Sequence, residues 1–214
     1  MKLFESQRGL ELSSLQWLLD HHRTKEAARR QMVDDLQFQP GDVILDLGCG
    51  PGLWTSMFAD KVGPSGKVIG LDFSPELIGH ALAERERRSD DHVVEFVLGD
   101  FYAAPFKDQA FDAVFVGNCA SYIPDVLELL GQHSRVTKRG GRVIAKEFDG
   151  AALIFHPIDP HLTLKVLAAA ARALVENPPL PPFDNFTGRK MHGIFRQAGL
   201  KEVATSTYAI QKVP

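Results

Sequence analysis

Short apolar segments alternate with helical patterns along the middle of the chain, and this alternation limits the possible folds more than any other feature. Helical patterns at Trp54–Lys61, after "SPEL" and at Asp125–Thr137 separate some of the strand candidates. The strand candidates are "DVILDL", "KVIGLD", "VVEFVL", "FDAVFVG" and "GRVIAKEF". Apolar strands that alternate with helices require a parallel sheet covered on both faces. The sequence therefore predicts an α/β fold with a doubly wound, mostly parallel sheet.

The segments on either side of this core have helical character. Helical composition runs to about Leu36, with a break expected near His22–Thr24. After the fifth strand candidate we expect a helical insertion that contains an alanine-rich helix at Leu162–Glu176. We expect one domain in four parts: an N-terminal helical lid (1–39), a core (40–149), an insertion (150–186), and a final helix and strand "KEVATSTYAI" (187–214).

Composition narrows the classes of function. The net charge of −3 over 214 residues gives no basic field for nucleic acid. No apolar run reaches membrane-spanning length, and Met1–Leu10 does not read as a signal peptide. Two cysteines, Cys49 and Cys119, cannot build a disulfide framework, but they end strands expected to be neighbours. We therefore expect a cytoplasmic protein with no membrane span and no nucleic-acid partner.

The glycine-rich stretch "VILDLGCGPGLW" at Val43–Trp54 follows the first expected strand, where open α/β sheets bind ligands. The dinucleotide fingerprint needs a third glycine where Leu53 stands, and the phosphate loop needs Gly-Lys-Ser/Thr. Pro51 has no N–H for an oxyanion, and Asp46 would repel a pyrophosphate. A nucleoside-like cation without phosphate fits better, and S-adenosylmethionine has these properties.

Four segments resemble the ordered motifs of class I S-adenosylmethionine-dependent methyltransferases. These segments are "LDLGCGPG", "VIGLDFSPELI", "FVLGDFYAAPF" and "FDAVFVGN", and together they span about residues 40–150. The resemblance implies the Rossmann-like fold of that family and S-adenosyl-L-methionine as cofactor, with S-adenosyl-L-homocysteine as product. The cofactor-binding residues that it implies are Asp46, Gly48, Cys49, Gly50, Gly52, Asp72, Phe73, Asp100, Phe101 and Asn118.

The resemblance also implies individual roles. Asp72 would accept hydrogen bonds from both ribose hydroxyls, and Asp100 would lie near the adenine amino group. Phe101 would contribute backbone contact, and Asn118 would lie beside the methionine portion. A structural interpretation stays open for several of these residues: Asp46 or Asp72 could cap helices, and the two phenylalanines could be core aromatics.

The loop after the fourth strand indicates what is methylated. It reads "GNCASY" rather than the Asn/Asp-Pro-Pro-aromatic loop of base-amino methyltransferases, and Asn118 rather than proline precedes Cys119. The insertion supplies apolar residues for a pocket near the cofactor's methyl group: Phe148, Ile154, Phe155, Ile158, Phe183 and Phe186.

This arrangement is similar to the family branch that acts on small lipophilic molecules, which includes quinone-precursor C-methyltransferases. We therefore expect methyl transfer to an O, N or C nucleophile of a small, lipophilic or aromatic molecule. Two alternatives stay open. One is a module that binds S-adenosylmethionine without turnover, and the other is a methyltransferase that acts on a protein or nucleic acid.

The segment "FHPIDPH" offers two histidines as general bases. His156 and His161 are the catalytic candidates, because the pKa of histidine lies near working pH. Asp159 could complete a two-histidine, one-carboxylate metal site, but two prolines disfavour it, and we expect no metal. Glu147 or Asp149 could also face the pocket, and the histidines of the N-terminal helix could reach it through a lid.

The chain ends where the family normally continues. Domains of this resemblance close with a seventh, antiparallel strand, whereas here only "QKVP" follows "KEVATSTYAI". An open sheet edge invites association. The sequence therefore predicts a shortened version of a longer protein, or a partner chain such as a second copy across that edge. A natural six-stranded variant is the alternative.

Overall fold

Five strands form one parallel sheet in the computed structural model, which describes residues 14–89, 92–153, 155, 157–176 and 183–210. The strands are β1 (Val43–Leu47), β2 (Lys67–Asp72), β3 (Val94–Leu98), β4 (Phe111–Gly117) and β5 (Thr137–Lys146). Their order in the sheet is β3-β2-β1-β4-β5. The order reverses between β1 and β4, and open α/β sheets bind ligands beyond the carboxyl ends of the strands at such a point. The predicted fold class is confirmed.

Seven helices accompany the sheet in the described part of the chain. They are α1 (Leu15–Arg23), α2 (Glu26–Asp35), α3 (Leu53–Val62), α4 (Pro75–Arg88), α5 (Val126–Val136), α6 (Pro160–Glu176) and α7 (Thr187–Gln197). Single 3₁₀ turns are η1 (Phe101–Ala103), η2 (Ala120–Tyr122) and η3 (Gly150–Ala152). The break between α1 and α2 lies where the sequence predicts it. The Ser-Pro start of α4 is also confirmed, because Ser74 accepts a hydrogen bond from the backbone N–H of Leu77 at 3.4 Å.

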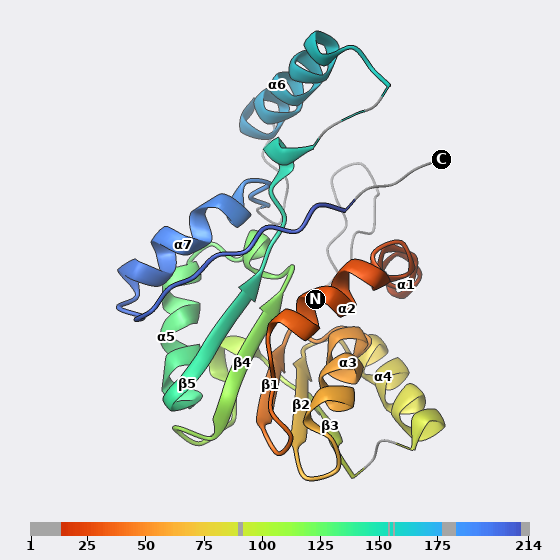
Figure 1. Ribbon diagram of the computed structural model, residues 1–214, viewed down its shortest axis with the longest axis vertical. Coiled ribbons are helices and arrows are strands. Elements are labelled where there is room, and N and C mark those ends of the chain that lie inside the picture. Colours follow the sequence, from red (N-terminus) through yellow and green to blue (C-terminus); the bar gives the residue numbers. More distant parts are fainter. Residues whose placement is uncertain (1–13, 90–91, 154, 156, 177–182, 211–214) are drawn as a thin grey trace.

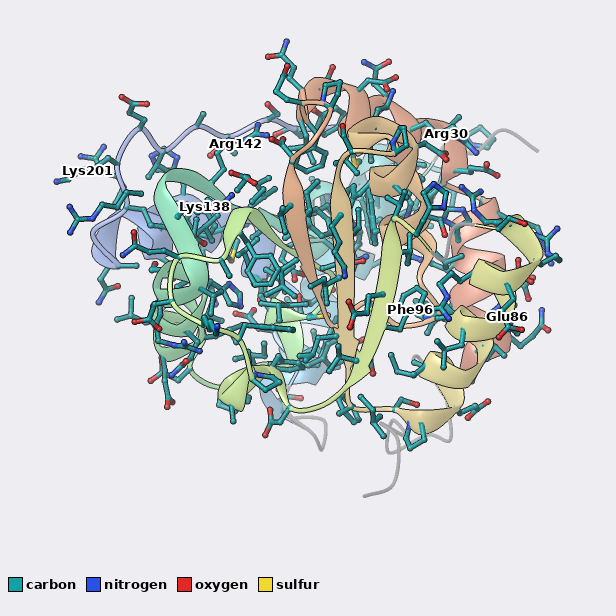
Figure 2. The ribbon with its side chains drawn as sticks, turned by 90° about the horizontal axis from the view of Figure 1, so that it is seen from below. Arg30, Glu86, Phe96, Lys138, Arg142 and Lys201 are labelled. Carbon is teal, nitrogen blue, oxygen red and sulfur yellow. The ribbon has the colours of Figure 1, made fainter. Side chains whose placement is uncertain are left out.

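Helices α2, α3 and α4 cover one face of the sheet, and α5 and α7 cover the other (Figure 1). Alternate residues of β1 enter two different cores, because successive side chains of a strand point to opposite faces. Ile44 joins the core under α3, whose aromatic centre includes Phe58 and Phe115 with ring centroids 4.9 Å apart. Leu45 joins the core under α5. Figure 2 shows Phe96 on the side of the sheet toward α4.

The predicted last strand is wrong. Residues 203–210 are not part of the sheet, and β5 has no strand partner on its outer side in the described part of the chain. The segment instead crosses the molecule toward α2 (Figure 1), where the Tyr208 hydroxyl donates to Asp35 at 2.7 Å and its ring packs against the core under α3. A dimer across the open β5 edge stays a prediction.

Helix α6 extends away from the sheet, and most of its side chains are exposed (Figure 1). The alanine-rich helix of the insertion is therefore confirmed as a helix. Within the described residues, no helix combines the length and apolar character needed to cross a membrane.

His133 of α5 is a buried histidine with unmet hydrogen-bonding capacity. Its side chain is 1% exposed, and neither ring nitrogen has a hydrogen-bond partner among the described residues. Burial lowers its pKa to about 4. The unfolded chain takes up a proton near pH 6.5 that the folded chain resists, so this histidine reduces stability as the pH falls from about 6.5 toward 4.

We expect His133→Leu to raise the free energy of unfolding by about 1–2 kcal/mol at pH 7, because it removes unpaired buried nitrogens. The gain should grow at pH 5. Urea unfolding at both pH values measures it. The exposed His192 supplies the control, since His192→Leu should change stability by less than about 0.5 kcal/mol. A destabilised His133→Leu protein, or a gain that does not depend on pH, would contradict this explanation.

Candidate functional site

The loop after β1 is held by the end of β2. The backbone N–H groups of Gly48 and Cys49 both donate to the Leu71 carbonyl, at 2.8 and 3.1 Å. The N–H of Gly50 donates to the Asp72 carboxylate at 2.8 Å. The first two expected motifs therefore form one unit at the carboxyl edge of the sheet.

Gly48, Gly50 and Gly52 of this loop all have positive φ angles, which other residues adopt at a cost. Gly48 has φ +66° and Gly52 has φ +79°. A Cβ atom on Gly48 would lie 2.5 Å from the Cys119 sulfur, and one on Gly52 would lie 2.7 Å from the Phe96 ring. The glycine spacing therefore reflects close packing of the loop as well as its turns.

The two cysteines both lie beside this loop, as their positions at neighbouring strand ends predict. The Cys119 sulfur is 3.7 Å from the Gly48 carbonyl oxygen, and Cys49 is itself part of the loop. Both are free thiols. Burial raises the pKa of each well above the usual value, so that neither is a reactive thiolate.

Two buried carboxyl groups lie at the base of the loop. Asp46 is 1% exposed and accepts a hydrogen bond from the Thr55 hydroxyl at 2.6 Å. Burial raises the pKa of Asp46 to about 7, and the nearby Asp72 contributes. Asp72 is 5% exposed and also accepts from the Ser74 N–H at 2.9 Å; burial raises its pKa as well. Such a pair favours a cationic ligand.

An arginine of α2 lies against the same region. Arg29 is 5% exposed, and its guanidinium carbon lies 4.8 Å from the centroid of the Trp54 ring. Its terminal nitrogens approach His22 Nδ1 at 2.9 Å and His21 Nδ1 at 3.3 Å. Its Nε has no hydrogen-bond partner among the described residues. Burial lowers the pKa of Arg29 to about 10, while attraction to Asp46 opposes that shift.

Sequence reasoning missed Arg29. A signal was present, because Arg29 shares one helical face with the buried residues Met32 and Val33. A charged residue within an apolar helical face indicates a buried partner or ligand. Helix α1 also reaches the loop, since a Cβ on Gly50 would lie 3.8 Å from a methyl carbon of Leu18.

Asn118 lies at the carboxyl end of β4 and is joined to β5. It has φ +58°, its backbone N–H donates to the Lys146 carbonyl at 2.8 Å, and its side-chain oxygen accepts from the Lys146 ammonium at 2.5 Å. Lys146 also escaped sequence reasoning, because a lysine at a strand end is ordinarily exposed.

The carboxylate next to Lys146 has a different environment. Glu147 accepts hydrogen bonds from the Ala120 N–H at 2.7 Å and from the Ser121 hydroxyl at 2.8 Å. Burial raises its pKa. Glu147 therefore fixes the η2 turn and does not pair with Lys146.

The third expected motif lies beside the second. Asp100 is exposed beyond β3 and accepts from the Tyr102 N–H at 2.9 Å. Phe101 is half-buried and packs against the core under α5, and Phe73 is half-buried after β2. The Gly99 N–H donates to the backbone carbonyl of Asp72 at 2.9 Å. The loops after β3, β2, β1 and β4 therefore form a continuous row.

The insertion holds two candidate bases, His156 and His161. The structure describes His161, and that residue does not lie in the row of loops. His161 is exposed on α6, and His156 lies outside the described residues. Asp159 accepts from the N–H of Leu162 near the start of α6, and Asp149 pairs with Arg189 at 2.7 Å. The catalytic assignment of the two histidines stays a prediction.

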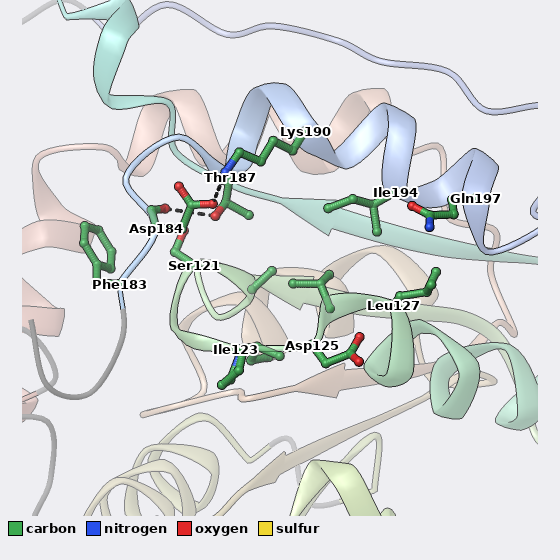
Figure 3. Close-up of a pocket in the computed structure, with 13 residues that line it drawn as sticks. Ser121, Ile123, Asp125, Leu127, Phe183, Asp184, Thr187, Lys190, Ile194 and Gln197 are labelled. Atoms are coloured by element: carbon green, nitrogen blue, oxygen red, sulfur yellow. Dashed lines mark hydrogen bonds and ion pairs between the residues drawn. The ribbon is translucent and has the colours of Figure 1, made fainter. Parts of the chain in front are cut away.

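A cavity of about 470 Å³ lies between η2, the start of α5 and α7. Figure 3 shows Ile123, Leu127 and Ile194 around it, with Asp184 and Lys190 forming an ion pair at one side. Of the apolar residues expected to form a pocket, Phe183 lines this cavity. Phe148, Phe155 and Ile158 are instead exposed, and Ile154 lies outside the described residues.

Comparison with known proteins finds the same family. A model described as a methyltransferase domain matches residues 38–199. Demethylmenaquinone methyltransferase of Lactococcus lactis subsp. lactis is 44% identical over 104 residues, which are 49% of this chain and 41% of that protein. An uncharacterized 37.1 kDa protein in transposon TN4556 of Streptomyces fradiae is 36% identical over 155 residues, 71% of this chain and 43% of that protein. The chain thus spans less than half the length of these relatives.

The fold has solved counterparts. A SAM-dependent methyltransferase from Aquifex aeolicus superposes with a TM-score of 0.66 at 18% identity, covering 89% of this chain and 88% of that one. A chain from the complex of the Haloferax volcanii Trm112 methyltransferase activator with a methyltransferase gives 0.68 at 22% identity, covering 93% and 77%. Together with the match over residues 38–199 and the ordered motifs, this shows that the chain belongs to the class I S-adenosylmethionine-dependent methyltransferases.

Proposed function

We propose that this protein binds S-adenosylmethionine at the glycine loop and transfers its methyl group to a small molecule. One observation carries the proposal. Two buried carboxyl groups, Asp46 and Asp72, lie under a loop that has no feature for phosphate, and a buried arginine lies against the same region. That arrangement of charges suits a ligand that has a sulfonium, an ammonium and one carboxylate.

Each charged or polar group of the site has a matching part of the cofactor. Asp72 would accept from the ribose hydroxyls, since each carboxylate oxygen has a second lone pair besides the one used for the loop N–H groups. Asp100 would lie near the adenine amino group, and Asn118 near the methionine portion. Asp46 would attract the ammonium, and Arg29 would bind the carboxylate.

The small-molecule acceptor is supported by two observations. The relatives with 35–44% identity include demethylmenaquinone methyltransferases. The cavity beside η2 is of a size and character that suits a small, partly apolar compound. Methyl transfer from a sulfonium is an in-line displacement, so the protein must align the acceptor and exclude water.

The direct test is formation of S-adenosylhomocysteine from S-adenosylmethionine with a panel of phenols, quinols, amines and sugars, and in parallel with unmodified protein and RNA. We expect turnover with at least one small molecule and none with the macromolecules. Asp72→Ala supplies the control with a weakened cofactor site. Cofactor binding without turnover on any acceptor would favour the non-catalytic alternative, and turnover on the macromolecules alone would contradict the small-molecule assignment.

The pKa of Asp46 gives this site a pH dependence. At pH 6 its carboxyl is mostly protonated, because its pKa is about 7, and at pH 8 it is mostly ionised. We expect S-adenosylmethionine to bind about 3- to 10-fold more tightly at pH 8 than at pH 6, because a cationic ligand favours the ionised form. Calorimetry at both pH values measures this ratio. Asp46→Asn should remove most of it, and an unchanged ratio in that variant would rule out Asp46 as the titrating group.

A further inference from the structure

Arg29 of α2 is a buried cation without a direct carboxylate partner in the described part of the chain. It is 5% exposed, and its Nε has no hydrogen-bond partner among those residues. Asp46 attracts it without forming an ion pair. A buried charge ordinarily requires a partner of opposite sign. The unused donor and the uncancelled charge therefore indicate that an anionic group comes from a ligand.

Two histidines of α1 lie against Arg29. The Nδ1 atom of His22 is 2.9 Å from one terminal nitrogen of Arg29, and the Nδ1 atom of His21 is 3.3 Å from the other. The Nε2 atom of His21 is also 2.5 Å from the Lys25 ammonium nitrogen. A neutral imidazole accepts a hydrogen bond at one ring nitrogen only. By the shorter contact of each ring, His21 accepts from Lys25 and His22 accepts from Arg29.

His22 orients Arg29 without cancelling its charge. Burial and the charge of Arg29 lower the pKa of His22, so that its imidazole is mostly neutral at pH 7. A carboxylate at this position would form an ion pair with the guanidinium and would weaken its attraction for a ligand. A neutral acceptor instead fixes the direction of the guanidinium and preserves its whole charge.

The helix that carries His22 lies over the glycine loop. Leu18 is four residues earlier on α1 and therefore on the same helical face, and its methyl carbon would lie 3.8 Å from a Cβ atom on Gly50. His22 itself lines a cavity of about 360 Å³ together with the loop residues Pro51 and Gly52. The contact between His22 and Arg29 is thus made beside the loop that we propose to bind the cofactor.

We propose that His22 is a positioning residue, which holds the fully charged Arg29 guanidinium for the carboxylate of S-adenosylmethionine and so selects ligands that retain that carboxylate. This inference rests on the proposed function. His22 takes up only one of the five N–H groups of Arg29, and the Nε group has no partner among the residues that the structure describes. Arginine therefore keeps donors for a carboxylate, which it commonly binds through two N–H groups.

The test compares S-adenosylmethionine with decarboxylated S-adenosylmethionine by calorimetry. The two ligands share the adenosine, the sulfonium and the amino group, and they differ in the carboxylate. We expect the wild type to bind S-adenosylmethionine at least about 10-fold more tightly, because an arginine–carboxylate pair is a charge-assisted interaction. His22→Leu should weaken S-adenosylmethionine binding about 5- to 10-fold and should change binding of the decarboxylated ligand less than about 2-fold.

Two further variants separate positioning from a general structural role. His22→Asn keeps an acceptor oxygen near the position of Nδ1 and should retain most of the preference for the carboxylate. His80 lies on α4 and lines the same cavity, so His80→Leu is the matched control and should leave the preference unchanged.

The outcomes distinguish this inference from the proposed function. Equal binding of both ligands by the wild type, or an unchanged preference in His22→Leu, overturns the inference and leaves the proposed function standing. Equal weakening of both ligands in His22→Leu also overturns it, because His22 would then act on the fold alone. Absence of S-adenosylmethionine binding to the wild type overturns the proposed function, and the inference falls with it.

Discussion

Replacing Asp72 with alanine is expected to lower the free energy of unfolding by about 2–4 kcal/mol and to weaken S-adenosylmethionine binding by roughly 10- to 100-fold. The carboxylate accepts the N–H groups of Gly50 and Ser74, and its removal leaves two buried donors unpaired. The ribose hydroxyls lose their partner in the same change. Thermal unfolding and calorimetry measure the two effects.

The matched control is Asp100→Ala. Asp100 is also an acidic residue after a strand, but it is exposed and accepts from a single N–H. Its removal should cost less than about 1 kcal/mol of stability. Asp72→Asn keeps one acceptor oxygen and should lose less stability than Asp72→Ala, while binding of the cation still weakens. An Asp72→Ala protein that matches the wild type in both stability and affinity would show that the carboxylate does not hold the loop.

Gly48→Ala is expected to destabilise the protein by about 2–4 kcal/mol. A left-handed backbone costs a non-glycine residue about 1–2 kcal/mol, and the added Cβ would lie 2.5 Å from the Cys119 sulfur. Cofactor binding should fall as well, because the loop must move. Urea unfolding and calorimetry give the two quantities.

A second substitution separates strain from steric overlap. Cys119→Ala removes the sulfur that the new Cβ would overlap. The Gly48→Ala/Cys119→Ala protein should therefore regain the stability lost to this overlap and keep only the loss caused by the left-handed backbone. Gly79 supplies the matched control: it lies inside α4 with nothing within 4 Å of an added Cβ, and Gly79→Ala should raise stability by about 0.5–1 kcal/mol. Full stability of Gly48→Ala, or no recovery in the double variant, would contradict this account of the loop.

The fold could be predicted where the residue types of a segment match the burial or the helix cap that the fold gives that segment. The five strands are apolar because both faces of a parallel sheet are covered, and α4 begins at a serine cap followed by proline. The last segment was not predictable in this way. "KEVATSTYAI" has strand composition, but Tyr208 in it contacts α2 and the core under α3, which leads the segment away from β5.

The row of loops that we propose to bind the cofactor could be predicted because its residues lie within sequence motifs. Arg29 and Lys146 were not, because each acquires its environment from tertiary contacts: Arg29 is buried on a helix before the first strand, and Lys146 ends the fifth strand and bonds to Asn118. The error for the insertion was of the opposite kind, because the sequence suggested site residues that the structure leaves exposed. Aromatic and histidine content suggested pocket walls, yet His161 and Phe155 are exposed, since α6 extends away from the sheet.

Calorimetric titration of the chain with S-adenosylmethionine and S-adenosylhomocysteine tests the central claim most directly, because it requires no knowledge of the acceptor. The arrangement of Asp46, Asp72 and Arg29 predicts binding of both ligands at one site per chain. Binding of both ligands should depend on Asp46, since S-adenosylhomocysteine keeps the ammonium that Asp46 is proposed to attract. An absence of heat with either ligand at millimolar concentration, in a sample shown to be folded, would contradict the account.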